Sequence, residues 1–155
     1  MEEVFQEAVN LLSKNEPIVV ATVVRTKGST PQKPGAKLVV RKDGTAVGTL
    51  GGGCVEGDIW FAAKEILRRK GGPEFRDYYL NEDIAARDGL VCGGTMYFFI
   101  EPIWEPQEFL PFGTEMVDAY ETGRPLGMAT LVRADSAGRG TPGAKILVRK
   151  DGSIY

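Results

Sequence analysis

Residues 49–58 read Thr49-Leu50-Gly51-Gly52-Gly53-Cys54-Val55-Glu56-Gly57-Asp58, and they join a β-forming run to a helical pattern. Three successive glycines allow positive φ angles and let a ligand approach the backbone, because no Cβ atom blocks it. A helix that begins just beyond them adds unpaired N–H donors and a partial positive charge. These features favour an anion, and Cys54 places a thiol at the same point. A tight turn beside a small buried cysteine is the simpler interpretation, and spacing alone does not separate the two.

The segments on either side of the glycine turn (residues 51–53) predict a hairpin and a helix. Residues 36–41 and 45–50 flank Asp43-Gly44, which is a strong signal for a β-hairpin. After the turn, apolar residues recur at helical spacing, and this predicts a helix over residues 55–69.

The N-terminal segments complete an α/β unit. Residues 2–14 have the periodicity of an amphipathic helix. The run from Pro17 to Arg25 is β-branched and almost entirely apolar, which is typical of a strand buried on both faces. We therefore expect a mixed β-sheet, with residues 17–25 and 36–50 at its centre and the helices 2–14 and 55–69 flanking it.

The rest of the chain predicts further strands and one modest helix. Residues 74–80 and 95–100 are β-forming and rich in aromatic side chains. Residues 101–113 contain three prolines and predict a connector. A helix is expected over residues 114–121.

The C-terminal part repeats the N-terminal part without a gap, 108 positions later. Pro34-Gly35-Ala36-Lys37 recurs as Pro142-Gly143-Ala144-Lys145, and Val40–Gly44 recurs as Val148–Gly152. Internal repeats indicate a structural unit used twice. We expect one domain over residues 1–103, followed over 104–155 by a helix and a partial repeat of 17–47 that packs on the same domain or on a partner chain.

The composition excludes several classes of function. The chain has no histidine, so Ser-His-Asp and Cys-His nucleophile pairs and histidine-based zinc sites are absent. Its net charge of −2 gives no indication of nucleic-acid or membrane binding. Two cysteines 38 residues apart form no disulfide framework, and no apolar run is long enough for a membrane span, so we expect a cytoplasmic protein.

A second Gly-flanked cysteine lies at the start of another β-forming segment. If Cys92-Gly93-Gly94 meets the glycine turn in space, the two form a glycine-walled pocket with thiols. Ser29 would add a hydroxyl donor, and Lys37 would add a cation for an anionic ligand. Neither the Walker loop pattern nor G-x-G-x-x-G occurs at this turn, which argues against a nucleotide site of either type.

Together these motifs resemble the XdhC/CoxI family of accessory proteins for xanthine dehydrogenase and related molybdenum hydroxylases. The resemblance rests on GSTPQKPGAK, then GGGCVEGD, then VCGG, in this order within residues 1–103. The family's arginine after the first of these prolines is replaced by Gln32, so Lys33 would have to make any anion contact there.

The resemblance implies that the chain binds molybdenum cofactor (molybdopterin) as cargo. It further implies that the chain protects the sulfurated form, delivers it to an apo-hydroxylase and contacts a cysteine desulfurase. The residues that match the family's motifs and would bind the cofactor are Gly51, Gly52, Gly53, Cys54, Glu56, Cys92, Gly93, Gly94, Ser29 and Lys37. Cys54 or Cys92 would contact molybdenum, because thiolates are soft ligands, and a helix N-terminus favours the thiolate form. Packing for Cys92 and a favourable first-turn charge for Glu56 are the structural alternatives.

Two other functions remain open from the sequence. The first is an enzyme with a cysteine nucleophile that acts on a small anion, although a chaperone without turnover suits a chain that lacks histidine. The second is a partner-docking module that uses the basic segment 25–42, which could equally be a solvated hairpin edge. The second copy ends before a full hairpin, so its open edge predicts a homodimer.

Overall fold

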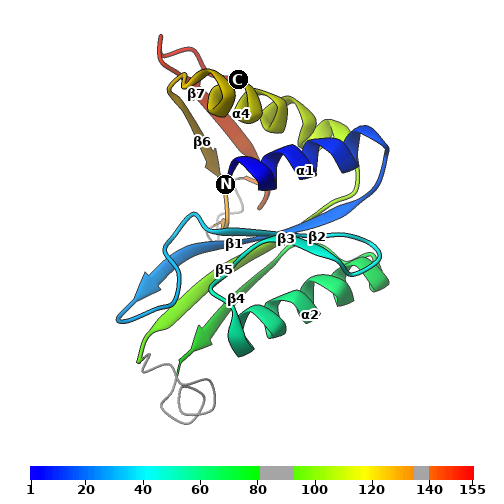
Figure 1. The fold of residues 1–155 in the computed structure, drawn as a ribbon. Coiled ribbons are helices and arrows are strands. Elements are labelled where there is room, and N and C mark those ends of the chain that lie inside the picture. The colour runs from blue at the N-terminus through cyan, green and yellow to red at the C-terminus, as the bar shows by residue number, and fades with distance from the viewer. Residues whose placement is uncertain (81–92, 135–139) are drawn as a thin grey trace.

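The computed structural model describes residues 1–80, 93–134 and 140–155, and its elements are labelled as in Figure 1. The helices are α1 (Glu2–Ser13), α2 (Gly53–Arg69), the short 3-10 helix η1 (Pro106–Glu108) and α4 (Leu110–Thr122). The strands are β1 (Ile18–Lys27), β2 (Lys37–Val40), β3 (Ala46–Gly48), β4 (Glu74–Tyr79), β5 (Thr95–Ile103), β6 (Leu126–Thr130) and β7 (Lys145–Arg149). No helix in these ranges is long and apolar enough to span a membrane.

Five strands form one sheet in the order β3-β2-β1-β5-β4, and β6 and β7 form a separate pair. The predicted α/β class is confirmed, and every pairing between these strands is antiparallel. β1 is central, as predicted. The hairpin of β2 and β3 was predicted to share the centre, and this is wrong: the second neighbour of β1 is β5, with Ile18 opposite Ile103, so the hairpin extends to one edge of the sheet.

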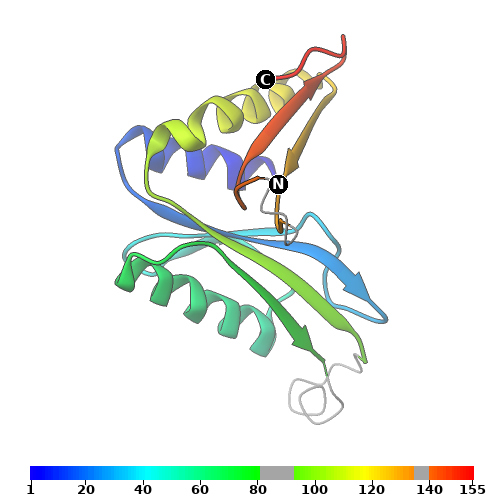
Figure 2. The same ribbon diagram turned by 180° about the vertical axis from the view of Figure 1, so that it is seen from behind.

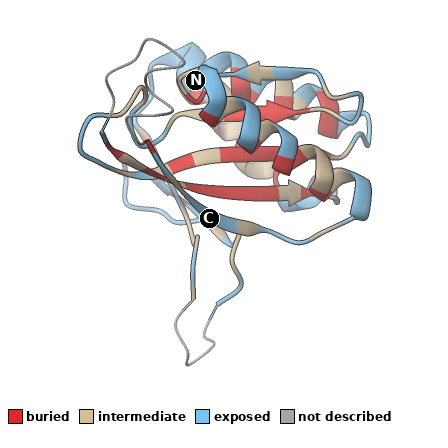
Figure 3. Cartoon of the chain, turned by 90° about the horizontal axis from the view of Figure 1, so that it is seen from below, coloured by how far each residue is buried: buried red, intermediate tan, exposed pale blue. Residues whose placement is uncertain are grey.

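The two predicted helices cover opposite faces of the sheet (Figure 1). On β1, Val19 and Ala21 pack toward α2, whereas Ile18 and Val20 pack toward α1. Successive strand side chains point to opposite faces, so the almost entirely apolar run supplies two cores at once. The inner strands are buried along most of their length (Figure 3).

The sequence repeat is also a structural repeat. α4, β6 and β7 take the places of α1, β1 and β2, and the bridge between Val148 and Ile154 takes the place of the β2–β3 pairing. Even an ion pair recurs: Arg41 Nε lies 2.8 Å from Glu7 Oε1, and Arg149 Nε lies 2.9 Å from Glu115 Oε2. Figures 1 and 2 show α1 and α4 side by side on the face of the sheet away from α2.

The predicted connector over residues 101–113 is wrong in part. β5 continues through Pro102 to Ile103, and α4 begins at Leu110 with Pro111 in its first turn. The β4 pairing ends opposite Ile100, so β5 has no strand neighbour on that side at Pro102. Proline in the first turn of a helix loses no hydrogen bond, because the N–H groups there have no partner within the helix.

Candidate functional site

The glycine turn has the geometry that the sequence predicts. Gly51, Gly52 and Gly53 have φ angles of 110°, 74° and 64°, in the region that glycine adopts without strain. α2 begins at Gly53, so Cys54 is the second residue of the helix, and its side chain is exposed.

The loop that follows β1 packs directly on this turn. A Cβ atom added to Gly51 would lie 2.8 Å from Cβ of Pro31. A Cβ atom on Gly94 would lie 2.3 Å from the Ser29 carbonyl oxygen, and one on Gly28 would lie 3.1 Å from the Gly93 carbonyl oxygen. The loop therefore touches the glycine turn on one side and Gly93-Gly94 on the other.

Glu56 closes the glycine turn from within the helix. Its Oε2 accepts hydrogen bonds from the Leu50 N–H at 2.6 Å, the Thr49 hydroxyl at 2.7 Å and the Gly52 N–H at 3.1 Å. Burial alone would raise the pKa of Glu56, but these hydrogen bonds together outweigh it and lower the pKa. Two backbone donors that the sequence predicted for an anionic ligand are therefore occupied by the chain's own carboxylate.

The surface around Cys54 is open. Nothing lies within 4 Å of a Cβ atom added to Gly52, two residues before it, or to Gly57, three residues after it. Ser29 is exposed in the neighbouring loop, whereas Cys92 lies outside the described residues. In the described ranges no three Cys, Asp or Glu side chains gather as a metal site.

A family comparison identifies the segment that carries this turn. Residues 11–78 match the model of the XdhC and CoxI family. This segment belongs to that family. The match includes the glycine turn, Cys54, Glu56, Ser29 and Lys37, and it confirms the resemblance drawn from the motifs.

Two relatives agree with the XdhC/CoxI assignment. The chain is 44% identical over 99 residues to a probable xanthine dehydrogenase component of Bacillus subtilis, a match covering 60% of the chain and 28% of that protein. It is 30% identical over 122 residues to the molybdenum cofactor insertion chaperone PaoD of Escherichia coli, a match covering 78% of the chain and 36% of that protein. The chain thus spans well under half of each relative.

The fold recurs in a crystal structure of a xanthine dehydrogenase from Bacillus halodurans. The TM-score is 0.62 at 23% identity, and the match covers 96% of this chain and 44% of that chain. At this identity the likeness concerns the fold.

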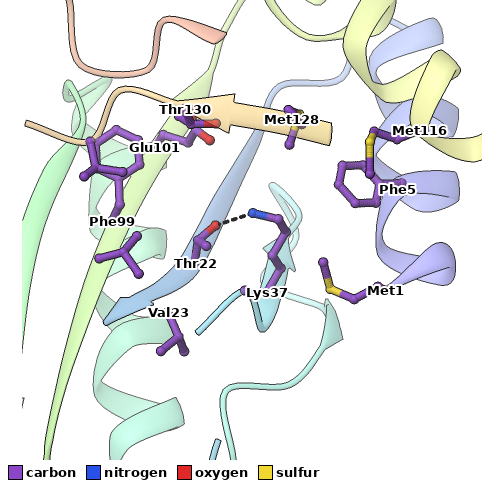
Figure 4. A pocket seen from close by; sticks show the side chains of 13 residues that line it. Met1, Phe5, Thr22, Val23, Lys37, Phe99, Glu101, Met116, Met128 and Thr130 are labelled. Carbon is purple, nitrogen blue, oxygen red and sulfur yellow. Dashed lines mark hydrogen bonds between the residues drawn. The ribbon is translucent and has the colours of Figure 1, made fainter. Parts of the chain in front are cut away.

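Lys37 of the XdhC/CoxI segment lies away from the glycine turn. Its Nζ donates to the Thr22 hydroxyl at 2.8 Å, in a cavity on the α1 side of the sheet, whereas the turn leads into α2 on the other side (Figure 4). The structure therefore does not bring Lys37 together with Cys54.

Sequence reasoning missed the buried charges beside Lys37. Glu101 and Lys145 form an ion pair, with 2.6 Å between Nζ and Oε2 and side chains only 8% and 4% exposed. Burial lowers the pKa of Lys37 to about 8; Glu101 opposes this shift, and Lys145 adds to it. A signal was available, because Glu101 is a lone charge in an apolar strand and Lys145 is the repeat counterpart of Lys37.

Proposed function

We propose that this chain is an accessory protein that binds molybdenum cofactor through the exposed edge formed by the glycine turn and Cys54 at the start of α2. In this role it protects the sulfurated cofactor in the cytoplasm and delivers it to the apo-form of a xanthine dehydrogenase-like hydroxylase, with no turnover of its own. The supporting observation is the exposed Cys54 on an open glycine turn within an XdhC/CoxI segment. The name of the relative PaoD, a cofactor insertion chaperone, points the same way.

The chemistry of this edge suits the cargo. Molybdenum is bound well by soft thiolate ligands, and Cys54 supplies a thiol at the beginning of a helix. The open space at Gly52 and Gly57 lets a bulky pterin approach the thiol from two sides. A cysteine desulfurase would deliver sulfur to the cofactor held at the same exposed edge.

Because the Leu50 and Gly52 N–H groups already donate to Glu56, the other site residues can be given more specific roles. Glu56 would repel a phosphate placed on the Leu50 and Gly52 N–H groups, so we assign Glu56 to bracing the turn. Gly52, Gly53 and Cys54 then face the cofactor, and the loop with Ser29 and the Gly93-Gly94 segment forms the neighbouring wall.

The docking alternative has less support. Of the basic side chains in segment 25–42, Lys37 lies in the cavity and Arg41 pairs with Glu7 at 2.8 Å. A cysteine enzyme also lacks support, because Glu56, the carboxylate two residues after Cys54, is committed to three hydrogen bonds.

We also propose that two copies associate through the outer face of β6 and β7. Ile146 and Val148 are 45% and 40% exposed there, whereas their repeat counterparts Leu38 and Val40 are buried beneath α2. A second copy presents the same apolar face, which is self-complementary about a two-fold axis.

Cofactor retention tests the proposed function. The chain is incubated anaerobically with molybdenum cofactor, passed over a size-exclusion column and analysed for molybdenum per protein. We expect a ratio near one, and at least a tenfold loss of retention in Cys54→Ser. Thr114→Ser, an equally small change at an exposed residue of α4, is the control. Unchanged cofactor retention in both Cys54→Ser and Cys92→Ser would show that neither thiol binds the cofactor.

A further inference from the structure

A cavity of about 450 Å³ lies where the two copies of the repeat meet. Its walls come from α1, β1, β2, β5, α4 and β6, so both copies contribute (Figure 4). Small-molecule sites in proteins have volumes of about 300–1,000 Å³. The cavity is therefore large enough for a small ligand, and it lies on the opposite face of the sheet from α2.

Three charged groups meet at the cavity: Lys37 and Glu101 line it, and Lys145 contacts Glu101 from outside the lining. The repeat places Lys37 in the first copy and Lys145 in the second, but β5 supplies a single carboxylate, Glu101. Lys145 Nζ forms an ion pair with this carboxylate at 2.6 Å and also donates a hydrogen bond to the Gly143 carbonyl oxygen at 2.9 Å. The described residues thus leave Lys37 without an ion-pair partner.

The amino group of Lys37 has unused hydrogen-bonding capacity. An ammonium group has three N–H donors. Within residues 1–80, 93–134 and 140–155, the hydrogen bond from Lys37 goes to the Thr22 hydroxyl alone. With a pKa of about 8, set mainly by burial, the group is still mostly charged at neutral pH. Burying a cation with one neutral hydrogen-bond partner costs free energy, and an anion bound beside it would offset that cost.

Glu101, which is paired with Lys145, and Thr130 also line the cavity, but one side of the lining is apolar and adaptable. Phe5 and Met116 come from the paired helices, and Met128 comes from β6 (Figure 4). Methionine side chains are flexible and fit apolar ligands of different shapes. A ligand that satisfies both parts of the cavity has one negative charge and an apolar body.

We propose that this cavity binds a small organic carboxylate, with its carboxylate on Lys37 and its apolar chain among Phe5, Met116 and Met128. The site uses neither Cys54 nor the glycine turn, so it is separate from the cofactor edge proposed above. It also accounts for the presence of a lysine at a position where an apolar residue would pack at a lower cost in free energy.

Calorimetric titration with straight-chain carboxylates from acetate to octanoate tests the site, because the best chain length is set by the cavity. We expect one carboxylate per chain and affinity that increases with chain length until the cavity is filled. The alcohol and the amine of the best chain length should bind at least tenfold more weakly. Lys37→Met, which keeps the volume and removes the charge, should reduce carboxylate affinity at least tenfold.

Two controls keep the interpretation specific. Lys42→Met removes an exposed lysine of the β2–β3 turn and should bind carboxylate like the unaltered chain. Circular dichroism should show Lys37→Met to be folded, and its molybdenum cofactor retention should be unchanged. Failure of every carboxylate to bind, or equal binding by Lys37→Met, would overturn the proposal without affecting cofactor binding at Cys54.

Discussion

At the scale of single residues, two charged side chains have opposite effects on stability. Glu56 gains hydrogen bonds on folding that stabilise its charged form. Lys37 loses water, and among the described residues it gains one hydrogen bond, to Thr22, and a partial stabilisation by the charge of Glu101. Functional sites commonly retain such destabilising groups, because their value lies in binding. Each residue therefore predicts a different dependence of stability on pH.

Lys37→Met should stabilise the folded chain in the absence of ligand. The folded-state pKa of about 8 lies below the ordinary value of 10.5, so the unfolded chain binds more protons between these pH values. The gain should be at most about 3 kcal/mol at pH 7 and should shrink as pH rises from 8 toward 10.5. Urea unfolding of both proteins across this range measures it. A variant less stable than the original at pH 7 would contradict the unpaired charge.

Glu56→Gln should destabilise the fold by about 1–2 kcal/mol at pH 7, because it weakens charge-assisted hydrogen bonds to the turn. The pKa of Glu56 is lowered on folding, so its contribution is present above its unfolded-state pKa and is lost as pH falls through the folded-state pKa. Thermal unfolding of both proteins between pH 3 and pH 7 should show the difference vanish in acid. Glu65→Gln is the control and should change little, because it removes a surface ion pair with Arg68.

At the scale of elements, most of the fold could be predicted from periodicity and turn signals. The helices 2–14 and 55–69, the strand 17–25 and the hairpin were placed within a few residues. The pairing and register of the strands could not be predicted, because a hydrophobic pattern does not say which strands are neighbours. The position of β5 beside β1 was therefore not predicted. For the same reason Lys37 could not be assigned to the face of the sheet away from α2. The prolines of residues 101–113 led to the wrong prediction of a connector, because they occupy positions in β5 and at the helix starts that need no N–H donor.

The glycines of the turn and of α2 should respond oppositely to alanine. Gly51→Ala forces a side chain into a positive φ and against Pro31, so we expect a loss of at least ~2 kcal/mol. Gly57→Ala adds a methyl group in open space within a helix and should stabilise by about 0.5–1 kcal/mol. Chemical denaturation of both variants measures this, and equal effects would refute the close packing of the loop on the turn.

At the scale of the whole molecule, one structural unit is used twice. Both copies build the helix, the first strand and the ion pair. The repeat could be predicted from the sequence, whereas the cavity between the copies depends on the three-dimensional packing of α1 against α4. That contact includes Phe5 of α1 and Tyr120 of α4, with ring centroids 6.1 Å apart.

The exposed face of the second copy predicts a dimer. Light scattering at increasing concentration should give twice the monomer mass, and Ile146→Asp should shift the mass to that of the monomer. Phe61→Asp changes a side chain on α2 that is 61% exposed and should leave the dimer intact. A monomer at every concentration would contradict the interface.

The most direct test of cofactor binding at the glycine turn is X-ray absorption at the molybdenum edge of the loaded chain. Cys54 as a ligand predicts one molybdenum–sulfur contact beyond those of the cofactor itself, present in the unaltered chain and in Thr114→Ser and lost in Cys54→Ser. The same number of sulfur contacts in the unaltered chain and in Cys54→Ser would contradict it.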